Sequence, residues 1–388
     1  MRRILYVEEA PAFGGSTSTL LHLVKRLDRG RYEPFVLFRY ALPARESFAA
    51  SGISVATMAS ITGADDEAPR IETSPETPAH KKTPSYRLLS SMKKYAARHR
   101  GESFRLARWM RSEGFALIHT NNSVSTNLGA LVGAARAGVP AVSHQRGFFR
   151  LTAFHRLLAR RVERFVCVSN AVRDHYIGEG LPAGLVQTVY DGVDLAALVP
   201  RAPARNERVL VGWFARFERW KGCDQFVEAA RIVLARRHDA EFIMAGAGPE
   251  EPNVRSRVES DPAFAARFHL PGFRKDALDL MAGCDIVVNS SIDPEPLSNT
   301  ALEALALGRP VVASNRGGNP EIVDHGVNGL LYDTMDPESL AAALLRLVED
   351  EALRRRFGAA GRARAESLFD AEAYSRGIQS LYAEILDA

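Results

Sequence analysis

The sequence is poor in cysteine, with only Cys167, Cys223 and Cys284 among 388 residues. An odd number of cysteines without metal-ligand spacing argues against both a disulfide framework and a cysteine-based metal site. Two of them, Cys167 and Cys284, lie in or beside apolar runs, so we expect reduced thiols in the protein core. Reduced thiols favour the cytoplasm, because disulfide frameworks belong to oxidising compartments.

Long apolar runs are also absent. No run reaches the roughly 18 to 20 residues that a helix needs to span a bilayer, and the longest candidate, 128–142, contains Arg136. The N-terminus resembles a signal peptide only in Arg2 and Arg3, because its apolar stretch stops at Glu8. We therefore expect a soluble protein whose first residues form a strand.

Composition and length predict a globular protein with two domains. Apolar residues make up 46% and charged residues 25% of the chain, and 388 residues exceed what one hydrophobic core usually serves. The net charge is only +4, but its distribution is uneven. Residues 1–190 contain 27 Lys and Arg against 15 Asp and Glu, whereas the remainder contains 23 against 31.

Short apolar runs alternate with helical patterns, which predicts parallel sheets covered by helices on both faces. The pattern occurs twice, so we expect an α/β fold with two doubly wound, Rossmann-like domains. Strands of the first sheet are expected at 4–7, 35–38, 117–119, 141–143 and 165–168. Strands of the second are expected at 209–213, 241–245, 268–271, 285–289 and 310–313, with helices near 222–237, 298–307 and 338–347.

The predicted domains are 1–195 and 207–365, joined by a segment rich in Pro, Ala and charge near 194–207. Residues 366–388 are expected to form a C-terminal helix that packs back on the first domain. A low-complexity stretch at 62–84 predicts a mobile loop. Because ligands bind beyond the carboxyl ends of parallel strands, two facing sheets would place a ligand in a central cleft.

Two glutamates follow the predicted strand 285–289. Glu295 precedes a predicted helix and Glu303 lies on it, and Ser298 or Asn299 is expected to cap that helix. A helix start offers backbone N–H groups and a positive dipole end to an anionic ligand. The spacing of the two glutamates alone is common by chance, and an isolated pair is typical of a solvated helix face.

The motifs around the two glutamates make their spacing more significant. The two glutamates are separated by seven residues and are followed by the segments 310–314, 317–323 and 326–331. This series resembles the signature of the large fourth family of retaining glycosyltransferases, of GT-B architecture (glycosyl transferases group 1). The resemblance implies that Glu295 hydrogen-bonds hydroxyls of the transferred sugar and that Glu303 holds the ribose of the nucleotide. Carboxylates suit both roles, because each accepts hydroxyl donors at charge-assisted strength.

The segment 214–222 resembles the family's Gly-Arg-Leu…Lys-Gly motif. The resemblance implies that Arg216 and Lys221 hold the donor diphosphate, although an isolated pair of cations at this spacing is more often a surface feature. Two fixed cations stabilise the charge that builds on a leaving phosphate. Since no convincing Asp-x-Asp metal motif is present, we expect activity without metal and without any other cofactor.

Further donor-binding positions are expected around these four residues. His144 follows a strand at a place where relatives often put a histidine at the sugar, although a lone histidine is more often structural. Ser298 stands where glycine often follows the first glutamate, which crowds the backbone donors there. The remaining expected donor-binding residues are Gly14, Gly15, Ser16, Gly246, Phe273, Arg274, Pro296, Leu297, Asn299 and Thr300.

Residues 81–111 contain ten Lys and Arg against one acid, Glu102, interleaved with aromatic residues. Such a surface can rest on anionic lipid, and the alternative is an ordinary solvated helix face. We therefore hypothesise peripheral contact with the inner face of a bacterial membrane, where a lipid-linked or polysaccharide acceptor would be found. No recognised nucleic-acid-binding module is present.

The predicted function is retaining transfer of a sugar, hexosyl or N-acetylhexosaminyl, from a nucleotide diphosphate donor, with uridine favoured over guanosine. One alternative is a nucleotide-sugar epimerase, which shares this architecture and donor type. The other is a nucleotide-sugar-binding subunit without catalytic activity. The sequence does not specify the sugar, the acceptor or the linkage.

Overall fold

The computed structural model describes residues 1–10, 14–63, 100–201 and 208–388. Contacts divide the chain into two units, unit 1 with Met1–Tyr190 and Tyr374–Ala388, and unit 2 with Asp191–Ala373. Most of the predicted mobile loop, from 64 to 84, and most of the predicted linker, at 202–207, lie outside the described residues.

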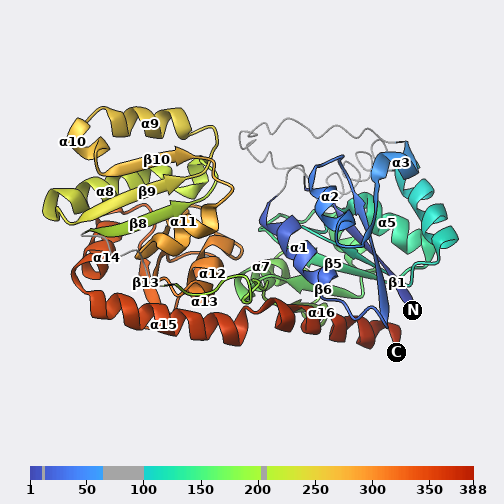
Figure 1. The fold of residues 1–388 in the computed structure, drawn as a ribbon. Helices are drawn as coiled ribbons and strands as arrows, with labels where there is room; N and C mark the ends of the chain where they lie inside the picture. The colour runs from blue at the N-terminus through green and yellow to red at the C-terminus, as the bar shows by residue number, and fades with distance from the viewer. Residues whose placement is uncertain (11–13, 64–99, 202–207) are drawn as a thin grey trace. The chain divides into compact units, whose positions relative to one another are not determined.

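Unit 1 is built on a seven-stranded parallel sheet in the order β3-β2-β1-β4-β5-β6-β7. Helices flank the sheet (Figure 1), which explains why residues 117–120 and 141–145 of its central strands are all buried. Its strands are β1 (Arg2–Glu8), β2 (Tyr32–Phe38), β3 (Ser54–Thr57), β4 (Leu117–Thr120), β5 (Ala141–Gln145), β6 (Arg164–Cys167) and β7 (Val186–Thr188). Its helices include α1 (Gly15–Lys25), α2 (Ala44–Ala49), α3 (Met58–Thr62), a helix over 100–113, α5 (Leu128–Ala137), α6 (Ala153–Ala159), α7 (Asn170–Gly178) and η1 (Ala183–Leu185).

The C-terminal helix α16 (Ala371–Leu386) contributes to the core of unit 1. Tyr374, Ile378, Leu381 and Tyr382 recur at helical spacing, so they share one face, and all four are buried with the sheet residues. The hydroxyl of Tyr382 donates to that of Tyr6 on β1 at 3.1 Å. Residues distant in sequence thus complete one hydrophobic core.

Unit 2 contains a six-stranded parallel sheet in the order β10-β9-β8-β11-β12-β13. The chain crosses over at β8, so the sheet changes winding direction between β8 and β11. Its strands are β8 (Val209–Phe214), β9 (Ala240–Ala245), β10 (Phe268–Gly272), β11 (Ile286–Asn289), β12 (Val311–Ser314) and β13 (Gly329–Tyr332). Its helices are η2 (Arg219–Lys221), α8 (Cys223–Arg236), α9 (Glu251–Glu259), α10 (Pro262–Ala265), α11 (Ala277–Gly283), α12 (Asn299–Ala306), α13 (Asn319–Ile322), α14 (Pro337–Glu349) and α15 (Glu351–Leu368).

Two glycines bring α15 close to α12. A Cβ atom on Gly358 would lie 2.2 Å from the carbonyl oxygen of Gly308, and one on Gly361 would lie 2.7 Å from the Leu305 side chain. Larger residues at these positions would therefore force the two helices apart. The close packing holds α12, the helix that carries Glu303, against the rest of unit 2.

Two doubly wound, Rossmann-like sheets confirm the predicted fold class. Within the described ranges, no helix is long and apolar enough to cross a membrane. Cys167, Cys223 and Cys284 are free and buried, and burial raises the pKa of each thiol to about 12.

Candidate active site

The loop after β8 is held in place by one serine. Ser290, which follows β11, is 1% exposed, and its hydroxyl accepts a hydrogen bond from the Trp213 indole at 2.8 Å. The same hydroxyl donates to the carbonyl oxygens of Lys221 and Gly222, both at 3.0 Å. Gly222 has φ of +72°, and a Cβ there would collide with the Ser290 carbonyl. These bonds fix the position of Lys221 at the carboxyl edge of the sheet.

Lys221 and Glu295 form an ion pair within unit 2. Glu295 is only 3% exposed, and Lys221 is largely covered. The ammonium group also lies 4.1 Å from the centre of the Trp220 ring. Only one carboxylate oxygen of Glu295 is used: Oε2 is buried and has no hydrogen-bond partner among the described residues. A buried carboxylate oxygen without a partner is costly unless a ligand donates to it.

The backbone around Glu295 is fixed by the loop after β12. Gly318 N–H donates to the Glu295 carbonyl at 2.7 Å. Gly317 has φ of +58°, and a Cβ there would lie 2.2 Å from the same carbonyl oxygen. Any side chain at position 317 would therefore displace Glu295. The two glycines are part of the segment 317–323 that the sequence analysis singled out.

The start of α12 is tied to both neighbouring strands. Ser298 is its N-cap and accepts from the Ala301 N–H at 3.3 Å, while the Asn289 amide donates to the Ser298 hydroxyl at 2.6 Å. Thr300 donates to the Phe214 carbonyl at the end of β8, at 2.8 Å. Asn299 is the first helical residue, and Pro296 and Leu297 are half-buried in the preceding loop. This end of the helix therefore lies at the carboxyl edge of the sheet.

Glu303 lies on α12 and is half-buried. Burial raises the pKa of its carboxyl group to about 7 by desolvation. Hydroxyl groups that donate to this carboxyl group would lower its pKa, because hydrogen bonds to the ionised form stabilise that form. More of the group would then be ionised at neutral pH, and the ionised form is the better acceptor.

Arg216 shares the loop with Lys221. It is 56% exposed and pairs with Glu218 at 2.8 Å. No motif in the sequence pointed to Glu218. Gly246 packs beneath this loop: a Cβ there would lie 1.8 Å from the Ala215 carbonyl. The loop after β9 thus supports the one that carries Arg216.

Phe273 and Arg274 follow β10 at the same edge of the sheet. Phe273 is 70% exposed, which is unusual for a large aromatic side chain. Arg274 makes two hydrogen bonds to Asp276, at 2.7 and 2.6 Å. An exposed ring beside a bidentate pair can stack against a flat ligand.

The predicted positions in unit 1 lie at the ends of β1 and β5. Gly14 is the N-cap of α1 and makes no side-chain cap, and Gly15 and Ser16 begin the helix. The Asn121 amide donates to the Ser16 carbonyl at 3.2 Å. A helix start without a side-chain cap keeps backbone donors for other partners.

His144 is fully buried on β5. Its Nδ1 lies 3.2 Å from Nε2 of His119, and the two rings stack at 5.4 Å. Burial, with Arg146 nearby, holds the pKa of both histidines well below its usual value, and that of His119 falls to about 3. His144 is thus a neutral imidazole with no exposed surface, and a donor-site role for it stays a prediction.

Among the residues that the structure describes, no group of three or more His, Cys, Asp or Glu side chains could hold a metal ion. The charged groups at the edge of the unit 2 sheet include Arg216, Glu218, Lys221, Glu295 and Glu303. They combine cations for an anion with carboxylates for hydroxyl groups.

Two family models match the chain. Residues 13–197 match the model described as Glycosyltransferase Family 4, and residues 208–350 match the one described as Glycosyl transferases group 1. Both models describe glycosyltransferases. The predicted enzyme class, a glycosyltransferase, is thereby confirmed; the first match begins after β1, and the second includes every strand of the unit 2 sheet.

Relatives of the glycosyltransferase include enzymes for different donors. A GDP-mannose-dependent mannosyltransferase from Corynebacterium glutamicum is 33% identical over 38% of this chain and 40% of its own. The Escherichia coli UDP-Gal:alpha-D-GlcNAc-diphosphoundecaprenol alpha-1,3-galactosyltransferase is 26% identical over 64% of this chain and 70% of its own. Spore coat protein SA from Bacillus subtilis is 26% identical over 57% and 67%. The aligned regions span 40% to 70% of the lengths of the curated relatives.

Among solved structures, Anabaena HepE in complex with UDP is similar, with a TM-score of 0.79. It is 21% identical, and the superposition covers 99% of this glycosyltransferase and 100% of that chain. Identity at this level supports the shared fold.

Proposed function

We propose that this glycosyltransferase is a retaining enzyme of family 4 that moves a sugar from a UDP-sugar to a lipid-linked or polysaccharide acceptor without a metal ion. The observation that carries the proposal is the Lys221–Glu295 pair, in which a buried carboxylate keeps one oxygen without a partner. A sugar hydroxyl that donates to Oε2 would remove the cost of that oxygen.

Lys221 has three N–H donors and can contact a phosphate while it keeps its bond to Glu295. Arg216 is exposed enough to reach the same diphosphate, and its guanidinium can bind phosphate oxygens bidentately. As the bond from the sugar to the phosphate breaks, negative charge grows on the leaving group. Both cations and the N-terminal end of α12 then stabilise that charge in place of a metal.

Glu303 would accept the ribose hydroxyls, and Phe273 and Arg274 would lie beside the base. Burial raises the pKa of Glu303. Two hydroxyl donors would lower that pKa again, because they favour the ionised carboxylate. The backbone groups at Pro296, Leu297, Asn299 and Thr300 complete the donor site.

Retention follows from attack on the face that the leaving phosphate occupies. The acceptor oxygen bonds to the anomeric carbon while the bond to the phosphate oxygen breaks, and the acceptor proton moves to that oxygen. No protein nucleophile takes part. We assign Gly14, Gly15 and Ser16 to donor binding, because free backbone N–H groups at the start of α1 can bind a phosphate.

The preference for uridine and for a lipid-linked acceptor is supported by the names of similar proteins. HepE is solved with UDP, and the Escherichia coli relative is named for a UDP-galactose donor and a diphosphoundecaprenol-linked acceptor. The Corynebacterium relative is named for GDP-mannose, so guanosine is the second candidate. A lipid-linked acceptor would place the enzyme at the inner face of the membrane.

A thermal-shift panel with UDP, GDP and their sugars tests the donor, because a ligand that binds the folded state raises stability by mass action. We expect UDP-sugars to give the largest rise.

A hydrolysis assay tests catalysis without metal. Slow donor hydrolysis in excess EDTA, abolished in Glu295→Ala, would support it. Activity that is lost in EDTA and restored by a divalent ion would overturn that part. Release of an isomerised nucleotide sugar without acceptor would instead identify an epimerase.

A further inference from the structure

Unit 1 contains a cavity of about 540 Å³ whose charged lining is entirely basic. It lies between the helix over 100–113 and the end of α5. We call it the arginine cavity. Its lining residues are Phe104, Arg105, Ala107, Arg108, Arg111 and Arg136.

The outer face of the 100–113 helix carries this charge. Leu106 and Met110 are fully buried on the inner face, whereas Phe104, Arg105 and Arg108 are exposed. These exposed positions recur at the spacing of one helical face. The helix is therefore amphipathic with a cationic outer face, and the outer aromatic ring is 54% exposed.

Acidic residues of the same helix do not offset this charge. Glu102 is 5% exposed and forms an ion pair with Arg39 inside unit 1. Glu113, at the far end, pairs with Arg3 at 2.9 Å. In the part of the chain that the structure describes, neither Arg105 nor Arg108 has a carboxylate partner. Two cations are thus available on the surface.

The other two arginines are held in position. Arg111 donates to the carbonyl oxygens of Arg136 and Ala137. Arg136 lies 4.3 Å from the centre of the Phe104 ring and donates to the Ser103 hydroxyl at 2.7 Å. This packing fixes the aromatic ring among the cations.

We propose that the arginine cavity docks this enzyme on the surface of an anionic phospholipid bilayer. Cations near such a surface attract its phosphates, and an exposed aromatic ring can enter the headgroup region. The exposed ring favours a bilayer over a nucleic acid or another soluble polyanion. The inference rests on the proposed function only in that a lipid-linked acceptor would lie in that bilayer.

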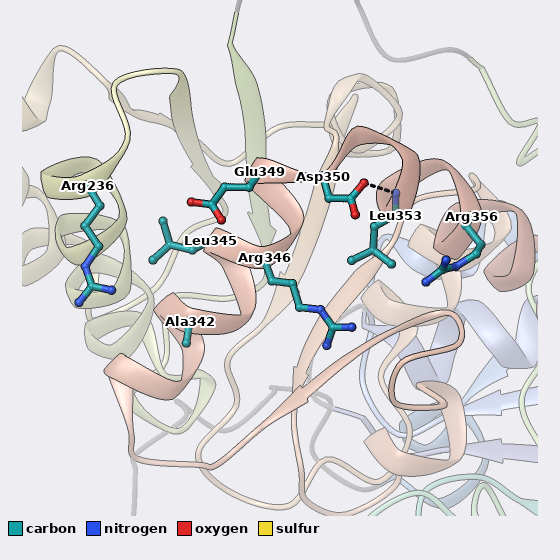
Figure 2. A pocket seen from close by; sticks show the side chains of 8 residues that line it. All are labelled: Arg236, Ala342, Leu345, Arg346, Glu349, Asp350, Leu353 and Arg356. Atoms are coloured by element: carbon teal, nitrogen blue, oxygen red, sulfur yellow. Dashed lines mark hydrogen bonds between the residues drawn. The ribbon is translucent and has the colours of Figure 1, made fainter.

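A second arginine-rich cavity, on unit 2, provides the control. Figure 2 shows Arg236, Arg346 and Arg356 around it, but Glu349 and Asp350 line it as well and no aromatic side chain does. It lies where α8, α14 and α15 meet (Figure 2). Its mixed charge gives less attraction for a lipid surface.

The test is cosedimentation with phosphatidylglycerol vesicles and with neutral phosphatidylcholine vesicles. We expect Arg105→Gln with Arg108→Gln to weaken binding to the anionic vesicles by roughly 25-fold, about fivefold for each cation. Arg346→Gln with Arg356→Gln leaves the same net charge and is expected to change binding less than twofold. Arg105→Lys with Arg108→Lys should keep most of the binding, because the charge is retained.

Equal losses in the two glutamine pairs, equal binding of the wild type to neutral vesicles, or no binding to either vesicle would overturn the proposal. The proposal would also be overturned if binding of an oligonucleotide required Arg105 and Arg108 while binding of vesicles did not. UDP affinity of the same variants, measured in solution, separates this proposal from the proposed function. We expect it to be unchanged, and a wild type that binds vesicles but no nucleotide would contradict the proposed function alone.

Discussion

Each unit buries a glutamate at the carboxyl edge of its sheet, and the two carboxylates differ in one respect. Glu8, at the end of β1, is fully buried and accepts from the amides of Asn121 and Asn122, both at 2.7 Å, and from the Ala10 N–H at 2.8 Å. Glu295 is 3% exposed, and one oxygen of its carboxylate pairs with Lys221. Its second oxygen has no partner within the described ranges.

The difference separates a structural carboxylate from one that is poised for a ligand. Glu8 connects β1 to the start of the loop after β4, and both of its oxygens are used. The partnerless oxygen of Glu295 carries a desolvation cost that folding alone does not offset. On this comparison, replacing Glu8 should affect stability first, and replacing Glu295 should affect donor use first.

The largest expected effect is that of Glu295→Gln on turnover. The amide oxygen can still accept from Lys221, but the new N–H₂ group is a poorer partner for a sugar hydroxyl than a carboxylate. We expect kcat/KM for the donor sugar to fall on the order of 100-fold. Stability measured by urea unfolding should change by about 1 kcal/mol or less. A large loss of stability with unchanged kcat/KM would make Glu295 a structural residue like Glu8.

Glu8→Gln is expected to show the opposite behaviour. The glutamine side chain would place an N–H₂ group against the N–H donors of Asn121, Asn122 and Ala10, so hydrogen bonds would be lost. The variant should therefore lose about 2 kcal/mol of unfolding free energy. Urea unfolding of the purified variant measures this. An unchanged unfolding free energy would show that the network around Glu8 adapts freely and would weaken the comparison.

Glu303 gives a pH dependence with a definite sign. With a pKa of about 7 it is mostly protonated at pH 6, and the ionised form is the better acceptor for ribose hydroxyls. Affinity for a UDP-sugar should therefore rise about tenfold from pH 6 to pH 8. Titration calorimetry across this range measures it, and Glu303→Gln should bind with no pH dependence. An affinity that falls as pH rises would contradict the assignment.

The smallest effect concerns Glu218, which pairs with the exposed Arg216. If the diphosphate must compete with this carboxylate, Glu218→Gln should tighten nucleotide binding about two- to threefold. Calorimetry at low and moderate salt would detect this difference, which should shrink as salt increases. Weaker binding would show that Glu218 positions Arg216 for the donor.

The fold was largely predictable from the sequence, because buried parallel strands are continuous apolar runs. Segments such as 35–38, 209–213 and 241–245 all lie in strands. Three strands were missed: β3, β7 and β13 have only three or four residues each. Strands that short, all three of them at sheet edges, carry too little apolar pattern to be distinguished from loops.

The contacts within the site were less predictable. The sequence indicated Lys221 and Glu295 by resemblance, but their direct ion pair depends on how three loops pack. The bonds that Ser290 makes to the Lys221 loop and the pairing of Arg216 with Glu218 left no signal, since serine after a strand and charges two residues apart are common. The burial of His144 was not anticipated, because its strand proved to be a central one.

The most direct test of the account is titration calorimetry of UDP and UDP-glucose with the wild type and Glu295→Gln. Only the sugar of the donor should contact Glu295, while both ligands offer a diphosphate to Lys221 and Arg216. The account predicts that the variant binds UDP as the wild type does and UDP-glucose much more weakly. Equal weakening for both ligands, or for neither, would contradict it.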